Sequence, residues 1–446
     1  KPDIDQIKKD AKKLEERFRK RNLELKERKA LRYGEYEIEI PLAYRKTSEV
    51  YKSPVIREEG RNIMALIQAT PIPAVPPPTP QDQDATTKME KFCSGMMQEL
   101  QSTYGSIDSM CASAQIHEKI GWIYFGMKRD WYSSKPDEEG DPLEYIQKLN
   151  QYKASEGISS VFEERFVPTS SAFHVGNVWN PTRFFEIKEV DEFDLIAEYG
   201  IKVQANGEWS MPDTTTLPSG EYEDSRYESS ARKIKFIEYW DREWCVLIAI
   251  NPTPNWKDKQ QAFELDSWKH GWGRVPYFPR PGFESDQIDE EKRFESPLDG
   301  LYTEIKTYNR VRTILSSVSY MTGFAPLKVV TKEGNELVMD ENGKPKAFLA
   351  FEPGKPAQLG AGQDVLPVIV SPEAHILQTE VDSSERRIVQ YSLSQIAKGI
   401  SPGSDTANSS LTTLRRMQRS SLSTLNANQA RQYREIFKFA FQRIIG

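Results

Sequence analysis

The chain has 446 residues, enough for one or two hydrophobic cores, and 38% of them are hydrophobic. Its formal net charge of −6 is a mildly acidic balance that does not by itself predict nucleic-acid binding. The three cysteines are too few and too scattered for a disulfide framework, and no apolar run approaches the roughly 18 residues of a membrane span. We therefore expect a soluble protein of a reducing compartment without a signal peptide, and, since the sequence starts at Lys1, further terminal segments outside it.

The N-terminal part predicts helices around a stiff connector. Apolar residues spaced three or four apart from Ile7 to Leu25 predict one long amphipathic helix that ends before Gly34. Six prolines between Pro71 and Pro80 favour an extended connector. Helical patterns then resume over 89–104 and over 107–127, and we expect the second helix to include the apolar run that ends at Met127.

The middle of the chain favours strands. Residues 161–190 mix aromatic and β-branched residues with turn signals, and 191–199 indicate a short helix closed by Gly200. Alternating patterns over 234–240 and 244–250, separated by three polar residues, predict a hairpin.

A long helix is predicted next. Ser296 and Pro297 form a good helix start, and the pattern continues to Gly323, which gives a rod of about 40 Å at 1.5 Å per residue. One stripe of this helix is apolar and needs a cover: Leu301, Ile305, Tyr308 and Leu315.

After Pro326 the pattern predicts short strands, then a helix from Ser371 that ends near Gly399. The stretch 400–410 is a polar loop, and a long helix resumes from Leu411.

The usual signatures of catalysis and metal binding are missing from the sequence. The four histidines are dispersed, and there is no phosphate-binding loop, dinucleotide fingerprint or nucleophile elbow. We therefore predict no catalytic residue, no metal and no cofactor. The acidic stretch 284–304 leaves two interpretations open, a solvated face or a divalent-cation site of a nuclease.

The C-terminal helix is basic within an acidic protein. Its only acid is Glu435, against seven basic residues: Arg415, Arg416, Arg419, Arg431, Arg434, Lys438 and Arg443. Such a stripe suits phosphate contacts without sequence readout, and equally an interface with another subunit.

The order of these parts resembles the portal proteins of tailed bacteriophages. The segment 167–200 looks like the part before the family's clip, and the long helix with Tyr308-Asn309-Arg310 in mid-course is similar to its stem helix. Lys398-Gly399-Ile400-Ser401-Pro402-Gly403-Ser404, which precedes a helix, is similar to its tunnel loop.

The resemblance implies an α+β, mainly helical portal fold with six parts. These parts are a wing (1–190), a pre-stem and clip (191–296), a stem helix (297–323), wing strands with a tunnel helix (324–398), a tunnel loop (399–410) and a helix towards the crown (411–446).

The resemblance also implies a structural role at the portal vertex of the virion, after assembly in the host cytoplasm. Expected partners are about twelve copies of the chain, double-stranded DNA, the large terminase subunit, a head–tail adaptor and the major capsid protein, with no membrane.

The resemblance also assigns residues to these parts. The residues facing DNA would be Lys398, Ser401, Ser404, Asp405 and Asn408. Arg415, Arg416 and Arg419 would contact phosphate or a neighbouring subunit, and the exposed apolar stripe of the stem helix would form the subunit interface. Clip residues would be Ile234, Phe236, Tyr239 and Trp244.

Two rival functions remain open. One is an accessory protein that binds double-stranded DNA without forming a ring, through the basic helix. The other is a metal-dependent nuclease that uses acids such as Asp286, Asp289 and Glu290.

Overall fold

The structure is a computed structural model, and it describes most of the chain with gaps. The described residues are 1–38, 50–67, 83–105, 107–127, 162–199, 202–203, 209–210, 233–250, 262–287, 293–323, 327–331, 334–337, 363–367, 374–392 and 422–445. The chain divides into two compact units. Unit 1 comprises Lys1–Lys26, Met64–Pro297 and Met417–Gly446, and unit 2 comprises Glu27–Ile63 and Leu298–Arg416. Each contains helices and strands, which confirms the expected α+β class.

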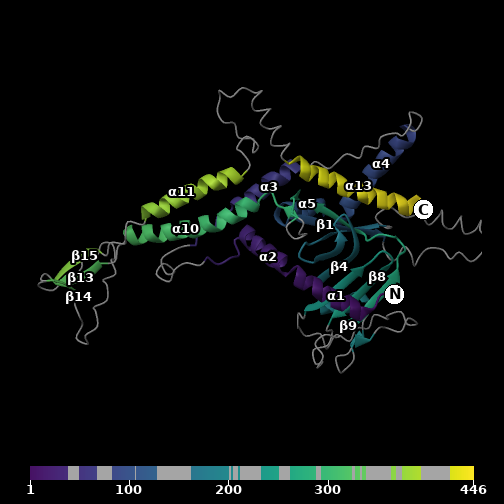
Figure 1. The fold of residues 1–446 in the computed structure, drawn as a ribbon, viewed down its shortest axis with the longest axis horizontal. Coiled ribbons are helices and arrows are strands. Elements are labelled where there is room, and N and C mark those ends of the chain that lie inside the picture. Colours follow the sequence, from purple (N-terminus) through teal and green to yellow (C-terminus); the bar gives the residue numbers. More distant parts are fainter. Residues whose placement is uncertain are drawn as a thin grey trace, which may run out of the picture. The chain divides into compact units, whose positions relative to one another are not determined.

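A five-stranded antiparallel sheet is the largest β element of unit 1 (Figure 1). Its order is β3-β4-β7-β8-β9, with β3 Ala172–Asn177, β4 Asn180–Asp191, β7 Lys233–Trp240, β8 Trp244–Ile250 and β9 Ala262–Lys269. The predicted hairpin is β7–β8. The Asp241 carboxylate closes its turn by accepting the backbone N–H groups of Glu243 and Trp244, each at 2.7 Å.

A second, three-stranded sheet has the order β10-β1-β2, with β1 Ile120–Met127, β2 Phe162–Val167 and β10 Tyr277–Pro281. The expected continuation of a helix to Met127 is therefore wrong. The helix α5 ends at His117, and β1 follows as the central strand, buried along almost its whole length. A strand buried on both faces shows a continuous apolar run, which periodicity cannot distinguish from a buried helix.

The remaining strands of unit 1 form two-stranded ladders. These are β5 Lys202–Val203 with β6 Trp209–Ser210, and β11 Phe283–Glu284 with β12 Phe294–Glu295.

Both faces of the large sheet are covered. The helices that lie wholly within unit 1 are α1 Ile4–Arg17, α4 Gln83–Tyr104, α5 Ile107–His117, α9 Glu192–Tyr199 and α13 Ser423–Ile445. The apolar face of α1 packs Ile7, Ala11 and Leu14 against one face of the sheet, around Phe185 and Ile248. The other face joins the main core with the three-stranded sheet, α4, α5 and α13. The sheet is thus buried on both sides, and α9 confirms the short helix predicted before Gly200.

Ion pairs between a half-buried arginine and two buried carboxylates connect the two sheets of unit 1. Arg165 of β2 bonds Glu186 of β4 at 2.6 Å and Glu238 of β7 at 2.7 Å. The Tyr277 hydroxyl of β10 donates at 3.1 Å to the Glu238 carboxylate. Because both carboxylates are buried, breaking these ion pairs would leave uncompensated charge between the sheets, so Arg165 helps to hold the two sheets together.

The predicted N-terminal helix is interrupted once. The chain leaves helical geometry at Phe18, so two helices replace one: α1 and α2 Arg19–Tyr33. The end of α2 agrees with the prediction, because Gly34 adopts φ +73° and the Glu35 N–H reaches back to the Ala30 carbonyl at 2.9 Å. Residues of α2, and of α3 Val55–Ile67, are divided between the two units.

Unit 2 contains two long helices and a small sheet. The helices are α10 Asp299–Gly323 and α11 Ala374–Tyr391, and the sheet β14-β13-β15 comprises β13 Leu327–Thr331, β14 Gly334–Leu337 and β15 Gln363–Pro367. The short strands predicted after Pro326 are confirmed. The long helix begins two residues later than expected: the Tyr302 N–H bonds the Leu298 carbonyl, and the Ser296 hydroxyl donates to the Ile116 carbonyl.

Gly282 follows β10 where two other backbone segments approach it closely. A Cβ atom there would lie 2.2 Å from the Glu295 carbonyl oxygen and 3.1 Å from that of Lys119. We expect Gly282→Ala to lower the free energy of unfolding by about 1–3 kcal/mol, because backbone atoms have to move. The matched control is Gly95→Ala in α4, where a Cβ meets nothing within 4 Å and helix propensity predicts a gain of about 1 kcal/mol. Urea unfolding of both variants, followed by tryptophan fluorescence, measures the difference, and equal effects would contradict it.

Candidate functional site

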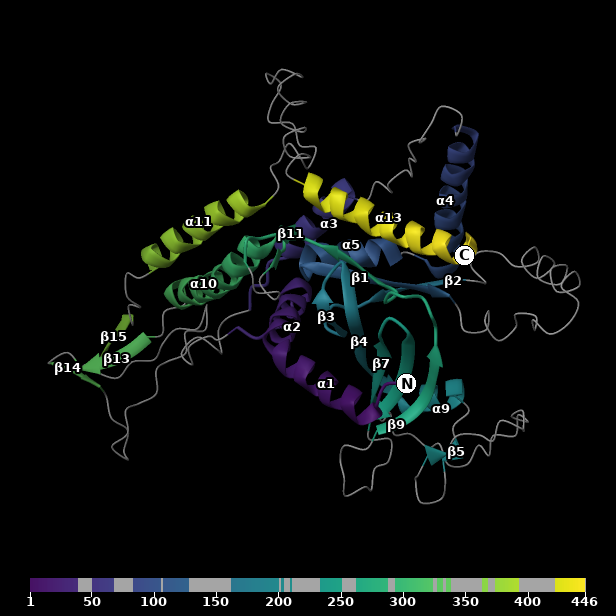
Figure 2. The same cartoon turned by 45° about the vertical axis from the view of Figure 1, so that its right-hand side comes forward.

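The two long helices of unit 2 form an antiparallel pair, which Figures 1 and 2 show side by side with the small sheet beyond one end. Arg387 of α11 bonds Glu304 of α10 at 2.8 Å. Further along, the Tyr308 hydroxyl donates to the Glu385 carboxylate at 2.9 Å. The order of these contacts runs in opposite directions in the two helices, so the pair is a hairpin that carries β13–β15 in its connection.

Polar side chains in the middle of α10 bind the preceding segment of unit 2. Asn309 accepts the Ser53 N–H at 3.1 Å, and the Thr313 hydroxyl accepts the Tyr51 N–H at 3.0 Å. The Thr313 hydroxyl in turn donates to the Asn309 carbonyl at 2.7 Å. These buried groups fix residues 50–53 along α10 without help from strand pairing.

The apolar stripe predicted on the long helix is largely internal. Leu301 and Ile305 are completely buried within the chain, Tyr308 is buried and Leu315 is half-buried. The expectation that Leu301 and Ile305 form an exposed stripe is therefore wrong, because neighbouring parts of the same chain already cover them. The described part of the helix pair instead exposes apolar side chains on α11: Ile376 at 70%, Val389 at 71% and Tyr391 at 49%.

The four residues predicted for a clip lie in the β7–β8 hairpin. Ile234, Phe236 and Tyr239 are buried in β7, and Trp244 is half-buried at the start of β8. Both strands are interior strands of the five-stranded sheet, so these side chains serve the core of unit 1.

The residues predicted to face DNA lie outside the described residues. This applies to Lys398, Ser401, Ser404, Asp405 and Asn408, and also to Arg415, Arg416 and Arg419. Their roles stay predictions.

The described part of the basic helix, α13, is a core helix with a basic outer face. Leu425, Phe439 and Ala440 are completely buried in unit 1. Arg434 and Lys438 are exposed. Arg431 stacks on the Trp179 ring at 3.7 Å. One face of α13 therefore stabilises unit 1, and the other presents positive charge.

A polar cluster anchors α13 to α5 and β10. No pattern in the sequence indicated this cluster. Arg280 of β10 is completely buried and forms an ion pair with Asp108 of α5, while its Nε donates to Gln432 of α13 at 2.7 Å. The Tyr433 hydroxyl donates to the same Asp108 carboxylate at 2.8 Å. Burial alone would raise the pKa of Asp108, but Arg280 and these donors hold it below its usual range.

Glu164 of β2 faces this cluster. Burial, and then the negative charge of Asp108, raises the pKa of its carboxyl group to about 7, with Arg280 opposing the shift. The side chain also lines a small cavity with Met97 of α4 and Tyr433 of α13. Glu164 is therefore a buried acid that changes charge near neutral pH.

The described residues offer no metal centre. Within those ranges no group of three or more histidine, cysteine, aspartate or glutamate side chains is placed to hold a metal ion. Of the acids considered for a nuclease, Asp286 is exposed, and Asp289 and Glu290 lie outside the described residues. In the same part of the chain, no helix combines the length and the apolar character needed to span a bilayer.

Comparison with known proteins gives no family for this chain. No protein-family model matches it, and no curated protein sequence is significantly similar to it.

Proposed function

We propose that this chain is the portal subunit of a tailed bacteriophage, a non-enzymatic protein that forms a ring-shaped DNA channel at one capsid vertex. The observation that carries the proposal is the helical hairpin α10–α11 of unit 2, which holds a small sheet in its connection and lies in the chain between the segments Met64–Pro297 and Met417–Gly446 of unit 1. Such a hairpin supplies the rod that we propose lines the channel.

The structure changes which residues we propose for subunit contacts. Ring subunits join through heterologous contacts, which need apolar side chains on the free surface. Ile376, Val389 and Tyr391 of α11 meet this requirement, whereas Leu301 and Ile305 do not. We also propose that the clip is the sheet β13–β15 in the helical connection, because Ile234, Phe236 and Tyr239 are already used in the core of unit 1.

The polar loop 399–410 remains our proposal for the DNA-facing element. The outer face of α13, with Arg434 and Lys438, adds positive charge in the described part of the same C-terminal region. A channel through which duplex slides requires weak contacts to phosphate that do not depend on sequence. The proposed partners are the large terminase subunit, a head–tail adaptor and the major capsid protein, at the portal vertex of the virion.

Mass photometry of the purified chain tests this proposal. We expect particles with a mass near twelve times that of one chain, and a central hole in negative-stain images. Ile376→Glu combined with Val389→Glu should shift the distribution to single chains at the same concentration, since each lost apolar contact costs about 1.5–3 kcal/mol per interface. Met110→Glu in α5 of unit 1, at another exposed apolar position, is the matched control and should leave the particles intact.

A wild-type chain that stays monomeric at micromolar concentration would overturn the proposal. A ring that survives the α11 double variant would leave the portal function standing and remove α11 as the interface. Circular dichroism of each variant shows whether the helices are retained.

A further inference from the structure

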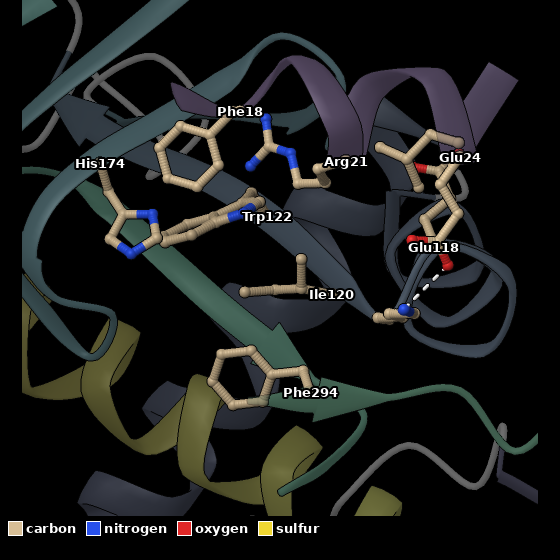
Figure 3. A pocket seen from close by; sticks show the side chains of 10 residues that line it. Phe18, Arg21, Glu24, Glu118, Ile120, Trp122, His174 and Phe294 are labelled. Carbon is tan, nitrogen blue, oxygen red and sulfur yellow. Dashed lines mark ion pairs between the residues drawn. The ribbon is translucent and has the colours of Figure 1, made fainter. Parts of the chain in front are cut away.

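A cavity of about 40 Å³ lies within unit 1, between the end of α1, the start of α2 and strand β1 (Figure 3). Its walls are partly apolar, with Phe18, Leu25 and Phe294, and partly polar, with Arg21 and Lys119. One water needs roughly 10–15 Å³ of such space, so the cavity has room for a group of a few heavy atoms.

The indole N–H of Trp122 is a buried donor in this wall. Trp122 is 1% exposed, and its Nε1 atom has no hydrogen-bond partner among the described residues. Figure 3 shows this nitrogen on the side of the ring toward Arg21 and Ile120. A buried N–H without an acceptor loses the hydrogen bond it makes in water, so an acceptor in the cavity would be favourable.

The charge around the cavity favours an anion. The charged side chains that line the cavity are balanced, because Lys119 is paired with Glu24 at 2.9 Å and Glu118 offsets Arg21. The excess positive charge comes from Arg17, which lies beyond the lining and acts on the neighbouring His174. The pKa of His174 reflects this positive charge. Burial lowers the pKa, and the charges of Arg21, Arg17 and Arg293 lower it further, to about 3. A carboxylate forms its strongest hydrogen bonds where a buried donor lies beside a positive potential.

We propose that this cavity binds a small carboxylate of formate or acetate size. One carboxylate oxygen accepts the Trp122 N–H, the charge lies toward Arg21, and a methyl group packs on Phe294 and Leu25. The size of the cavity and the acid at its rim disfavour a larger, doubly charged phosphate. This proposal is independent of the proposed ring function, because every residue it uses belongs to unit 1.

A titration of the full chain with sodium acetate tests the proposal, with isothermal calorimetry and tryptophan fluorescence as readouts. The acetate replaces sodium chloride, so that the ionic strength stays constant. We expect saturable binding with a Kd on the order of 1 mM, since even the most efficient ligands of four heavy atoms reach a Kd of only about 40 μM. Trp122→Phe should weaken binding at least about tenfold by removing the donor to a charged acceptor. Phe294→Trp, which fills the cavity from the opposite wall, should abolish binding while the Trp122 indole remains.

Trp179→Phe is the matched control. The Nε1 atom of Trp179 also has no partner among the described residues, but Trp179 does not line the cavity, so acetate affinity should not change. The proposal is overturned if acetate gives no saturable signal beyond chloride up to about 100 mM, a hundredfold above the expected Kd. Equal losses in the Trp122 and Trp179 variants would overturn it too, and the Phe294 variant decides the matter if Trp122→Phe does not fold.

Discussion

Replacing Arg280 with methionine should destabilise unit 1 by about 3–5 kcal/mol at pH 7, the range for breaking a buried ion pair from one side. The Arg280 side chain is completely buried, so no water replaces its charge beside Asp108. Methionine fills a similar volume, and the loss therefore comes from the carboxylate left without its cation and from the Gln432 amide oxygen, which keeps only the weak Cys111 thiol donor at 3.9 Å. Tryptophan fluorescence during urea unfolding measures this effect specifically, because all nine tryptophans lie between Met64 and Pro297, within unit 1.

The pH dependence of this variant identifies the cause. The pKa of the Asp108 carboxyl is lower in the folded state than its unfolded value of 3.8. The ionised carboxylate therefore stabilises the fold at pH values above 3.8, and this stabilisation is lost as pH falls through the folded-state pKa. The variant should therefore differ most from wild type near neutral pH and approach it in acid. Asp108→Asn combined with Arg280→Met removes both charges and should recover part of the loss. A loss of the same size in the single and double variants would show that packing, rather than charge, is responsible.

The sequence predicts the local elements of this protein well where a pattern is confined to neighbouring residues. The β7–β8 hairpin, α9 and the end of α2 at Gly34 all follow from turn and capping residues beside a periodic segment. Strand β1 does not, because its residues are buried on both faces and its apolar run has no period.

The polar cluster of unit 1 was beyond sequence reasoning for another reason. Asp108 and Arg280 are separated by 172 positions in the chain, and Gln432 follows 152 positions after Arg280. Charges are common in the sequence, and only tertiary packing selects the few that are buried together. The same packing explains why Leu301 and Ile305 are internal: periodicity shows that a stripe is covered, but not whether the cover is another subunit or the same chain.

Glu164→Gln should stabilise unit 1 at pH 8, by about 2–4 kcal/mol, and change it little at pH 4. The folded-state pKa of about 7 lies above the ordinary glutamate value of 4.5. A raised carboxyl pKa means that the folded state binds the proton more tightly than the unfolded state does. The stability that this proton contributes is complete below pH 4.5 and is lost as pH rises through 7. Each unit of difference corresponds to about 1.4 kcal/mol, which sets the size of the effect. Glutamine keeps the shape of the protonated acid and cannot ionise.

The control for this variant is Glu163→Gln, the neighbouring position on β2, whose side chain is half-buried. Urea unfolding of wild type and both variants between pH 4 and pH 8 gives the comparison. A wild-type stability that falls above pH 6, together with a flatter curve for Glu164→Gln alone, would assign the dependence to this carboxyl. Parallel curves for wild type and Glu164→Gln would mean that the carboxyl is solvated in the folded state.

Because Met97 of α4 and Tyr433 of α13 line the cavity beside Glu164, its ionisation should weaken the packing of α4 first. Faster hydrogen exchange in α4 at pH 8 than in α5, after correction for the intrinsic pH dependence of exchange, would locate the effect there.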